Sequence, residues 1–401
     1  MFLFFFSISI PFSNHIANDF MILSLLAWFF TVKKNFRGDW LLSVMGLLTV
    51  SYIISSIVNW GNVPSEFVKS HTSVSKEIFS LATPFIWFFI VRSAPISWKK
   101  ISFLLGSFAT AVFANTLLQM VLNKAPYSLV ANNRLSFYYN PNFSAGLIAL
   151  SCLALLWMLF KYKNPSLRCI FTIMFLVNSA GLYFTFSRGA WLGLFITLLI
   201  LIVYLSKKRI PLVATLILLA LGTFFLIVPR LTLPQNVTTT IMHNSQDVSN
   251  GRVEIWQTAL NIVRDHPWFG VGPKMFKTFY TRTSHLTSSP NAIHHIHAHN
   301  NFLQVLVEAG VFGLLFFIFL DILLFWRICH LIKDSAKESP LRGLAIVLLG
   351  WLIIWNIHGL FDYTFGLKYY TTPLLFLLGL LLANPTHTAV APSNVEQFNK
   401  A

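Results

Sequence analysis

Charged side chains are scarce in this sequence of 401 residues. Only 10% of the residues are Asp, Glu, Lys or Arg, whereas 56% are hydrophobic. Soluble domains carry about 25% charged residues, so the composition excludes an ordinary soluble domain. The 3 cysteines lie in or beside apolar runs and imply no disulfide framework. We therefore expect an all-α, polytopic membrane protein whose core lies largely in lipid.

Acidic residues are the rarer of the charged groups, with 13 Asp and Glu against 29 Lys and Arg and a net charge of +16. They form no Asp-x-Asp pair and no carboxylate cluster of the kind that holds magnesium on a diphosphate. The sequence also lacks a P-loop and a Gly-x-Ser-x-Gly nucleophile elbow. If the protein handles phosphates, arginines rather than a metal must neutralise them, and we expect no cofactor.

Twelve apolar segments of the sequence approach the length of a membrane-spanning helix. Such a helix needs about 20 apolar residues and tolerates about 17. The first segment is short and is separated from the second by Pro11–Asn14, so we expect about 12 transmembrane helices, with 11 possible. The segments cover residues 2–12, 16–32, 40–57, 75–91, 101–122, 143–160, 169–186, 190–205, 210–228, 302–328, 344–361 and 369–383.

Basic residues predict the orientation of these helices. They sit in short loops between apolar runs rather than in one basic domain, which favours topology determinants over nucleic-acid binding. If segment 16–32 ends in the cytoplasm, the cytoplasmic loops and tail hold 17 of the 29 Lys and Arg, and the opposite short loops hold 6. The other 6 lie in one long loop on the outer side, which in a Gram-negative cell is the periplasm.

The chain accordingly divides into four regions. These are an N-terminal transmembrane bundle (1–229), a large periplasmic loop (230–300), the last three transmembrane helices (301–384) and a cytoplasmic tail (385–401). The loop contains 7 of the 12 histidines of the chain. A loop of this size is unusual unless it has structure or function.

Part of the loop carries the signals of a helix. Asn250 and Gly251 are capping residues, Glu254 is an acidic residue for the first turn, and Pro267 ends the helical pattern. Between these signals, apolar side chains recur at helical spacing. They are Val253, Trp256, Leu260 and Val263.

Two arginines are candidates for anion binding. Arg188 lies in the short outer connection Phe186–Trp191, close to membrane depth, where a charge is costly unless it is paired or faces a wet cavity. It either extends to lipid headgroups or binds an anion inside the bundle. Arg252 opens the loop helix and is either a solvated charge beside Glu254 or a phosphate-binding group. The planar guanidinium fork matches phosphate oxygens.

Four histidines fall within six positions, at His294, His295, His297 and His299. His295 and His299 could bind zinc, with His297 or His294 as a further ligand, if the segment is helical. Alternatively, the cluster is a polar entry to the next helix, or one histidine acts as a base. His299 is the best candidate for a base, because it and Asn300 directly precede an apolar helix at the outer mouth of the bundle.

Two acidic residues lie near the same outer surface. Asp362 follows the penultimate apolar segment and either orients a histidine, pairs with an arginine, or is a helix-end charge at the interface. Glu308 falls within an apolar segment, and we expect it to be hydrogen-bonded inside the bundle.

The segment His299–Gly313 resembles the H-[NSQ]-x9-G-x-x-[GTY] signature of O-antigen ligases at all fixed positions. Ser187–Trp191 and Asn250–Gln257 are similar to the same superfamily, with Asn140–Asn142 as weaker support. This superfamily also includes O-antigen polymerases and bacterial O-oligosaccharyltransferases. The resemblance extends to the topology, in which one large outer loop precedes the last three helices.

The resemblance implies an O-antigen ligase of the bacterial inner membrane with its active site facing the periplasm. Such enzymes transfer a glycan, without metal, from undecaprenyl diphosphate to a sugar hydroxyl of lipid A–core. By the family pattern, Arg188 and Arg252 match the phosphate-side arginines, His299 the essential histidine and Asp362 an acidic position.

The expected mechanism combines these residues. The prenyl tail of the donor lies in membrane lipid and its diphosphate contacts the two arginines, while the histidine takes a proton from the acceptor hydroxyl. Attack in line would invert the configuration of the sugar. The expected catalytic residues are those named from the family pattern, and the expected substrate-binding residues are Arg188, Arg252, His295, His297 and Asn300.

Other functions remain open alternatives. An O-antigen polymerase would use the same donor, and a protein O-oligosaccharyltransferase would use a protein acceptor. Because the sequence ends soon after the last apolar segment, we expect no C-terminal extension of the kind that many oligosaccharyltransferases carry. A metal or solute transporter would also have many helices. Most charged candidates lie at the outer face, which favours surface chemistry over transport.

Overall fold

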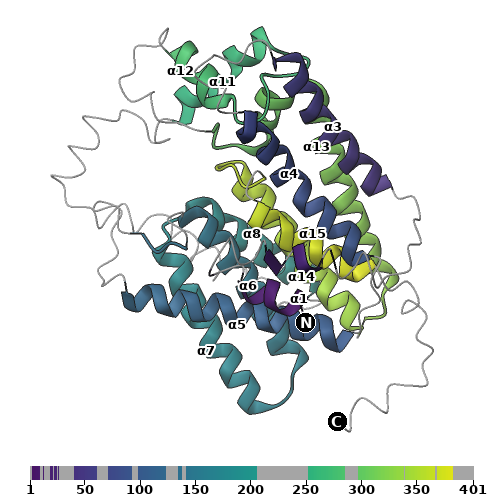
Figure 1. The fold of residues 1–401 in the computed structure, drawn as a ribbon. Coiled ribbons are helices and arrows are strands. Elements are labelled where there is room, and N and C mark those ends of the chain that lie inside the picture. The colour runs from purple at the N-terminus through teal and green to yellow at the C-terminus, as the bar shows by residue number, and fades with distance from the viewer. Residues whose placement is uncertain are drawn as a thin grey trace, which may run out of the picture.

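The computed structural model describes residues 2–9, 40–60, 71–92, 98–122, 134–137, 141–205, 252–284, 297–337, 339–365 and 368–382, with a few positions between 12 and 26. Within these ranges the regular elements are helices and no β-strand occurs, which confirms the all-α prediction for the described part of the chain (Figure 1). The predicted segment 210–228, the tail, most of segment 16–32, and His294 and His295 lie outside the described residues.

The described helices follow the predicted apolar segments closely. Six of them, α3, α5, α6, α7, α13 and α14, are long and apolar enough to cross a membrane, so the chain is a multi-pass membrane protein. The total of 12 or 11 spans stays a prediction. The helices are α1 (Phe2–Ser9), α3 (Trp40–Val58), α4 (His71–Arg92), α5 (Trp98–Leu122), α6 (Pro141–Lys161), α7 (Pro165–Phe184), α8 (Arg188–Leu205), α11 (Arg252–Asp265), α12 (Phe276–Ser284), α13 (Asn301–Asp334), α14 (Pro340–Gly359) and α15 (Lys368–Leu382).

Helix α14 lies at the centre of the bundle and packs against α6, α8, α13 and α15. Small residues allow its close approach to α8: Gly193 lies against the backbone of Ile354, and Gly350 lies against Thr197. The hydroxyl of Thr197 donates to the carbonyl oxygen of Gly350 at 3.1 Å. Lipid removes most of the hydrophobic drive between helices, so close packing and interhelical hydrogen bonds of this kind hold such bundles together.

A second, smaller core lies outside the bundle, where α11 and α12 pack on the first turns of α13 (Figure 1). We call it the outer cluster; it consists of Ile255, Ala259, Ile262, Val271, Met275, Phe276, Tyr280, Ala298 and Val307. The loop helix predicted from the sequence is present as α11, and Pro267 follows its end. Its buried face differs from the predicted apolar stripe, because Val253 and Leu260 are 44% and 48% exposed. The small residues Thr258 and Ala259 face the cluster and let α12 approach.

Helix α13 is broken at Gly310, where the backbone has φ 69° and ψ −168°. The carbonyl groups freed by the break accept hydrogen bonds from the segment after α11. Val271 N donates to Val307 O at 2.8 Å and Gly272 N to Glu308 O at 3.0 Å. In return, Val311 N donates to Pro267 O at 2.9 Å. Backbone groups at a helix break need such partners in a membrane protein, so these bonds join the outer cluster to the bundle.

Gly310→Ala should destabilise the protein, for two reasons. The left-handed backbone costs a residue with a side chain about 1–3 kcal/mol, and an added Cβ would clash with the backbone carbonyl of Trp268. Gly46→Ala in α3 is the matched control, because a Cβ there meets no atom within 4 Å. Thermal unfolding in detergent should show a lower melting temperature for Gly310→Ala than for Gly46→Ala. Equal melting temperatures would contradict the strained break.

Candidate active site

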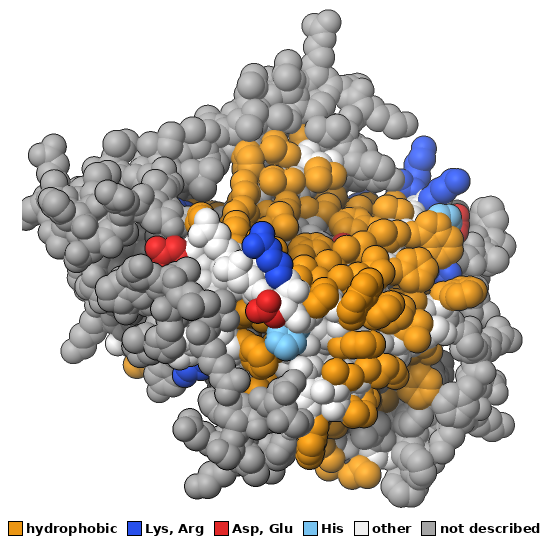
Figure 2. Space-filling view, turned by 90° about the horizontal axis from the view of Figure 1, so that it is seen from above, with side chains coloured by type: hydrophobic (Ala, Val, Ile, Leu, Met, Phe, Trp, Pro, Cys, Tyr) orange, Lys and Arg blue, Asp and Glu red, His pale blue; other side chains and the backbone are white. Residues whose placement is uncertain are grey.

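Polar side chains from distant parts of the sequence meet where the outer cluster sits on the bundle. They come from residues 297–300 before α13, the turn 360–365 after α14, the start of α11, and the turn between α7 and α8. Figure 2 shows a broad hydrophobic surface seen from above, with a few charged and histidine side chains on the same face. This position suits chemistry on a group that is presented at a membrane surface.

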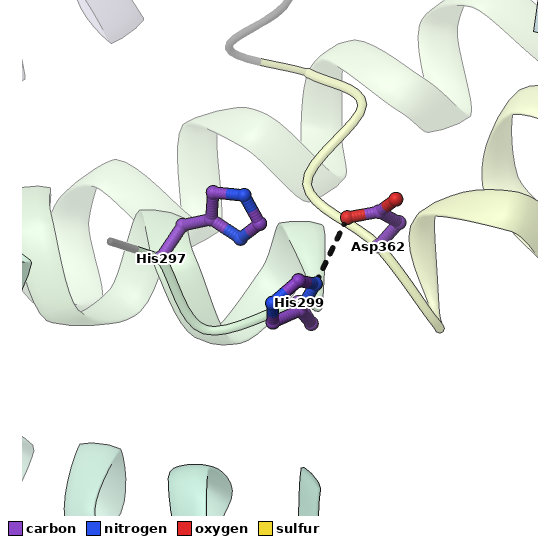
Figure 3. Close-up of side chains that lie close together, drawn as sticks. All are labelled: His297, His299 and Asp362. Carbon is purple, nitrogen blue, oxygen red and sulfur yellow. Dashed lines mark hydrogen bonds and ion pairs between the residues drawn. The ribbon is translucent and has the colours of Figure 1, made fainter. Parts of the chain in front are cut away.

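His299 and Asp362 form the central pair. His299 Nδ1 lies 3.1 Å from Asp362 Oδ1 (Figure 3). The side chain of His299 is 26% exposed and that of Asp362 is 8% exposed, so only the histidine is open to a ligand. Since a carboxylate can only accept, we assign the Nδ1 proton to the bond with Asp362. Nε2 of a neutral His299 is then free of that proton and can act as a base.

Asp362 is held as a carboxylate. Its Oδ1 also accepts from the backbone N–H of Tyr363 at 2.8 Å. Burial alone would raise the pKa of Asp362, but the hydrogen bond with His299 and electrostatic interactions with His358, His297 and His299 outweigh burial and hold the pKa well below its ordinary value. An ionised Asp362 fixes the tautomer of His299 and stabilises the imidazolium that forms when His299 takes a proton.

The peptide before His299 is fixed from both sides. Ala298 N donates to Gln304 Oε1 at 2.6 Å, and Trp256 Nε1 donates to Ala298 O at 3.0 Å. Gln304 Nε2 in turn donates to Glu308 Oε1 at 2.8 Å, so the prediction that Glu308 is hydrogen-bonded is confirmed. His299 itself adopts φ 48°, a strained value for a residue with a side chain. Helix α11 and the first turns of α13 together therefore fix the position of His299.

Two asparagines tie this segment to the turn that carries Asp362. Asn300 caps α13 by accepting from Leu303 N at 3.0 Å, and its amide donates to Leu360 O at 3.2 Å. Asn301 is buried, and its Oδ1 accepts from the backbone N–H groups of Thr364 and Phe365 at 2.8 Å and 2.9 Å. The hydrogen bonds of Asn300 give it a structural role, and its part in substrate binding stays a prediction.

Arg134 lies close enough to Arg188, Arg252 and Asp362 for their charges to shift its pKa, and Arg252 lies close enough to Asp362 for the same effect. Burial lowers the pKa of Arg252 at the start of α11, and the charge of Asp362 opposes that shift. Burial also lowers the pKa of Arg134, which Asp362 opposes and which the charges of Arg188 and Arg252 reinforce. Guanidinium groups remain charged despite such shifts. The site therefore concentrates positive charge around one carboxylate.

The turn that presents Arg188 contacts His358, which lies on α14 one helical turn before Asp362. Phe186, in this turn, has φ 50°, and the hydroxyl of Ser187 lies 3.3 Å from Nε2 of His358. His358 is buried one turn before Asp362, and Gly189 packs directly against its ring. A side chain at Gly189 would push against that ring, so a small residue is needed beside Arg188.

The structure brings Arg188, Arg252, His297, His299 and Asp362 to one place, as the sequence analysis expects of a single site. His295 lies outside the described residues. The sequence analysis did not identify the supporting residues described above, because their roles depend on contacts across the fold. They are Arg134, Trp256, Asn301, Gln304 and His358.

A possible metal-ligand group also differs from the zinc set considered from the sequence. His297, His299 and Asp362 each offer one ligand atom, and these atoms lie within 4.8 Å of one another. The rings of His297 and His299 approach edge to face, with centroids 4.1 Å apart (Figure 3). Zinc binding through Nδ1 of His299 would require this histidine to give up its hydrogen bond to Asp362. The absence of metal from the chemistry therefore stays a prediction with a test.

Comparisons with known proteins relate part of the chain to a described family. Residues 173–318 match the family model described as O-antigen ligase. An O-antigen ligase of Pseudomonas aeruginosa is 27% identical over 275 residues, which cover 68% of this chain and 60% of that protein. A general O-oligosaccharyltransferase of Acinetobacter baylyi is 30% identical over 139 residues, covering 34% of this chain and 23% of that protein. The matches thus span less than two thirds of the length of either relative.

The fold and site define a multi-pass membrane protein with a polar outer site, and the matched region contains Arg188, Arg252 and His299. Residues 173–318 are thus similar to the O-antigen ligase family.

The lowered pKa of Asp362 predicts a specific dependence of stability on pH. A carboxylate whose pKa is lower in the folded state than in the unfolded state contributes stability above the unfolded value, about 3.9, and loses it as the pH falls. Wild type should therefore have a higher melting temperature than Asp362→Asn from pH 8 down to about pH 5, and the gap should close below about pH 4. A gap that closes between pH 7 and pH 5 would mean that burial raises the pKa of Asp362 instead.

Proposed function

We propose that this protein is an O-antigen ligase of the bacterial inner membrane. It transfers a glycan from undecaprenyl diphosphate to a sugar hydroxyl of lipid A–core at the periplasmic face. The observation that carries this proposal is the 3.1 Å hydrogen bond between His299 Nδ1 and Asp362 Oδ1 beside a cluster of arginines. This arrangement supplies a base and an anion-binding surface within one site.

In the proposed reaction, Nε2 of His299 takes the proton of the acceptor hydroxyl. The hydroxyl oxygen attacks the anomeric carbon of the donor sugar from the side opposite the diphosphate. The bond between that carbon and the diphosphate oxygen breaks, and the leaving oxygen keeps the electron pair. Attack in line inverts the anomeric configuration.

The charges that develop on the leaving group and on the base in this reaction are equal and opposite. As the sugar leaves, the diphosphate gains one negative charge, and His299 gains one positive charge with its new proton. Arg188 and Arg252 are proposed to contact the diphosphate, and Asp362 to stabilise the imidazolium. Fixed groups of this kind stabilise the developing charge more in the transition state than in the ground state, which lowers the barrier. His297, His295 and Asn300 are proposed to contact the substrates.

Removing the base or a phosphate-side arginine should abolish transfer without loss of the protein. The assay measures glycan transfer from a lipid-linked donor to lipid A–core with the purified full chain in lipid. His299→Ala should lower the rate about 10²–10⁴-fold, and Arg252→Ala or Asp362→Asn about 10²–10³-fold. Arg264→Ala, an exposed position at the end of α11, is the control and should retain the wild-type rate. Wild-type transfer by His299→Ala would rule out its assignment as the base.

The choice of acceptor separates the proposal from its alternatives, since one of the two relatives is named a general O-oligosaccharyltransferase. The lipopolysaccharide of a deletion strain, separated on a gel, should contain core without O-antigen, while lipid-linked polymer accumulates. Core capped by a single repeat would instead identify a polymerase. Loss of a glycoprotein signal with intact lipopolysaccharide would identify a protein oligosaccharyltransferase, and metal-dependent uptake would identify a transporter.

Exhaustive chelation should leave the transfer rate of the purified protein unchanged, because arginines rather than a metal are proposed to neutralise the diphosphate. The same samples, before and after treatment, would be analysed for bound metal. Loss of transfer that one added metal restores would overturn this prediction and would assign the metal to His297, His299 and Asp362.

A further inference from the structure

We propose that Arg134 is a third phosphate-binding residue of this site and makes it selective for a prenyl diphosphate over a prenyl monophosphate. The inference rests on the proposed function, because it extends the donor site. Arg134 lies in the described segment 134–137, between α5 and α6, far in sequence from Arg188 and Arg252.

Hydrogen bonds hold the guanidinium of Arg134 beside the turn that presents Arg188. Arg134 Nε donates to Thr185 O at 2.7 Å, and Arg134 Nη2 donates to Asn142 Oδ1 at 2.9 Å. Leu135 N donates to Phe184 O at 2.9 Å, which fixes the backbone of the same segment against the end of α7. The arginine is therefore preorganised at the mouth of the bundle and is not a freely moving surface side chain.

These bonds use only part of the donor capacity of Arg134. A guanidinium has five N–H groups, and Arg134 donates through Nε and Nη2 to the two oxygens named above. Within the ranges that the structure describes, no acceptor faces Nη1 or the second N–H of Nη2. A guanidinium whose rotamer is already fixed and that has further N–H groups can bind an anion with little loss of conformational entropy.

Charge in the site indicates what kind of anion would bind. Arg134 is half-buried and feels the positive charges of Arg188 and Arg252, whereas Asp362 is the one described carboxylate that opposes them. The three guanidinium groups come from three separate elements, and one carboxylate leaves an excess of positive charge. Binding of an anion would relieve this repulsion.

A diphosphate fits this arrangement better than a single phosphate. A phosphate monoester presents one group of terminal oxygens, whereas a diphosphate presents two groups along a chain. Three guanidinium forks from separate elements can each find oxygens on a diphosphate. On a monophosphate, Arg134 would compete with the other two arginines for the same oxygens. Loss of Arg134 should therefore affect the diphosphate more than the monophosphate.

The test measures binding directly and requires no transfer. The purified full chain, in nanodiscs of zwitterionic lipid, is titrated with undecaprenyl diphosphate and, separately, with undecaprenyl monophosphate. Arg134→Gln should raise the Kd of the diphosphate about 10–100-fold, as expected for loss of a charge-assisted contact, and that of the monophosphate less than about 3-fold. Arg134→Lys keeps the charge without the fork and should fall between Arg134→Gln and wild type.

Asn142→Ala is the matched control for a purely structural role. It removes the hydrogen bond to Nη2 and leaves the charge of Arg134 in place. If Arg134 only braces the turn, Asn142→Ala and Arg134→Gln should weaken binding of both lipids alike and lower the melting temperature alike, and the inference is overturned. A wild-type diphosphate Kd for Arg134→Gln would overturn the inference too. In the transfer assay described above, a change confined to the KM of lipid A–core would also overturn it, because it would place a phosphate of the acceptor beside Arg134.

The two proposals fail in distinguishable ways. If wild type binds undecaprenyl diphosphate through Arg134 but transfers no glycan, the proposed function fails and the binding site stands. If wild type transfers glycan and Arg134→Gln binds and transfers equally well, the proposed function stands and the inference fails.

Discussion

The hydrogen-bonded seam between Pro267–Gly272 and Val307–Val311 is the contact on which the site depends. It joins backbone to backbone at a break in a membrane helix, where unpaired peptide groups would be costly. Helix α11, which carries Arg252, lies on one side of the seam, and the half-helix 301–309, which follows His299 and its cap Asn300, lies on the other. Because both are fixed to the same break, His299 and Arg252 keep a constant position relative to each other.

The charged groups of the site cost the fold stability, because they are partly buried. Arg134, Arg252 and Asp362 share a partly buried space, and burial penalises each of these charges. Asp362 offsets some of this cost through its hydrogen bonds with His299 and Tyr363. Because these charged groups are positioned when the protein folds, no further free energy is needed to order them. Such preorganisation would favour the proposed reaction, because fixed groups need not move as charge develops on the leaving group.

The sequence predicts the parts of this structure that depend on local pattern. Long apolar runs have few stable conformations in a membrane, so the helices lie where their runs lie. Arg252 could be located because it begins a helix, and His299 because it directly precedes the cap of one. Contacts across the fold decided the rest. Val253 and Leu260 have the spacing of a buried stripe, yet they are exposed because α11 turns a different face, that of Ile255, Ala259 and Ile262, toward the outer cluster. Arg134 could not be assigned, since its partner Thr185 lies 51 residues away.

The spacing between His299 and Gly310 acquires a physical reason from the break in α13. Residues 301–309 form a half-helix whose length, at 1.5 Å per residue, is about 13 Å. This length sets the distance of His299 from the break. The hydrogen bonds of Asn300 and Asn301 fix the start of the half-helix to the turn that carries Asp362. One residue more or fewer would turn His299 by about 100° about the helix axis and separate it from its carboxylate. Gly310 permits the break, and Gly313, packed against Ser51 of α3, lets the rest of α13 approach the bundle. The spacing of His299, Gly310 and Gly313 thus describes one structural unit, a helix that follows the histidine and is interrupted at a fixed distance from it.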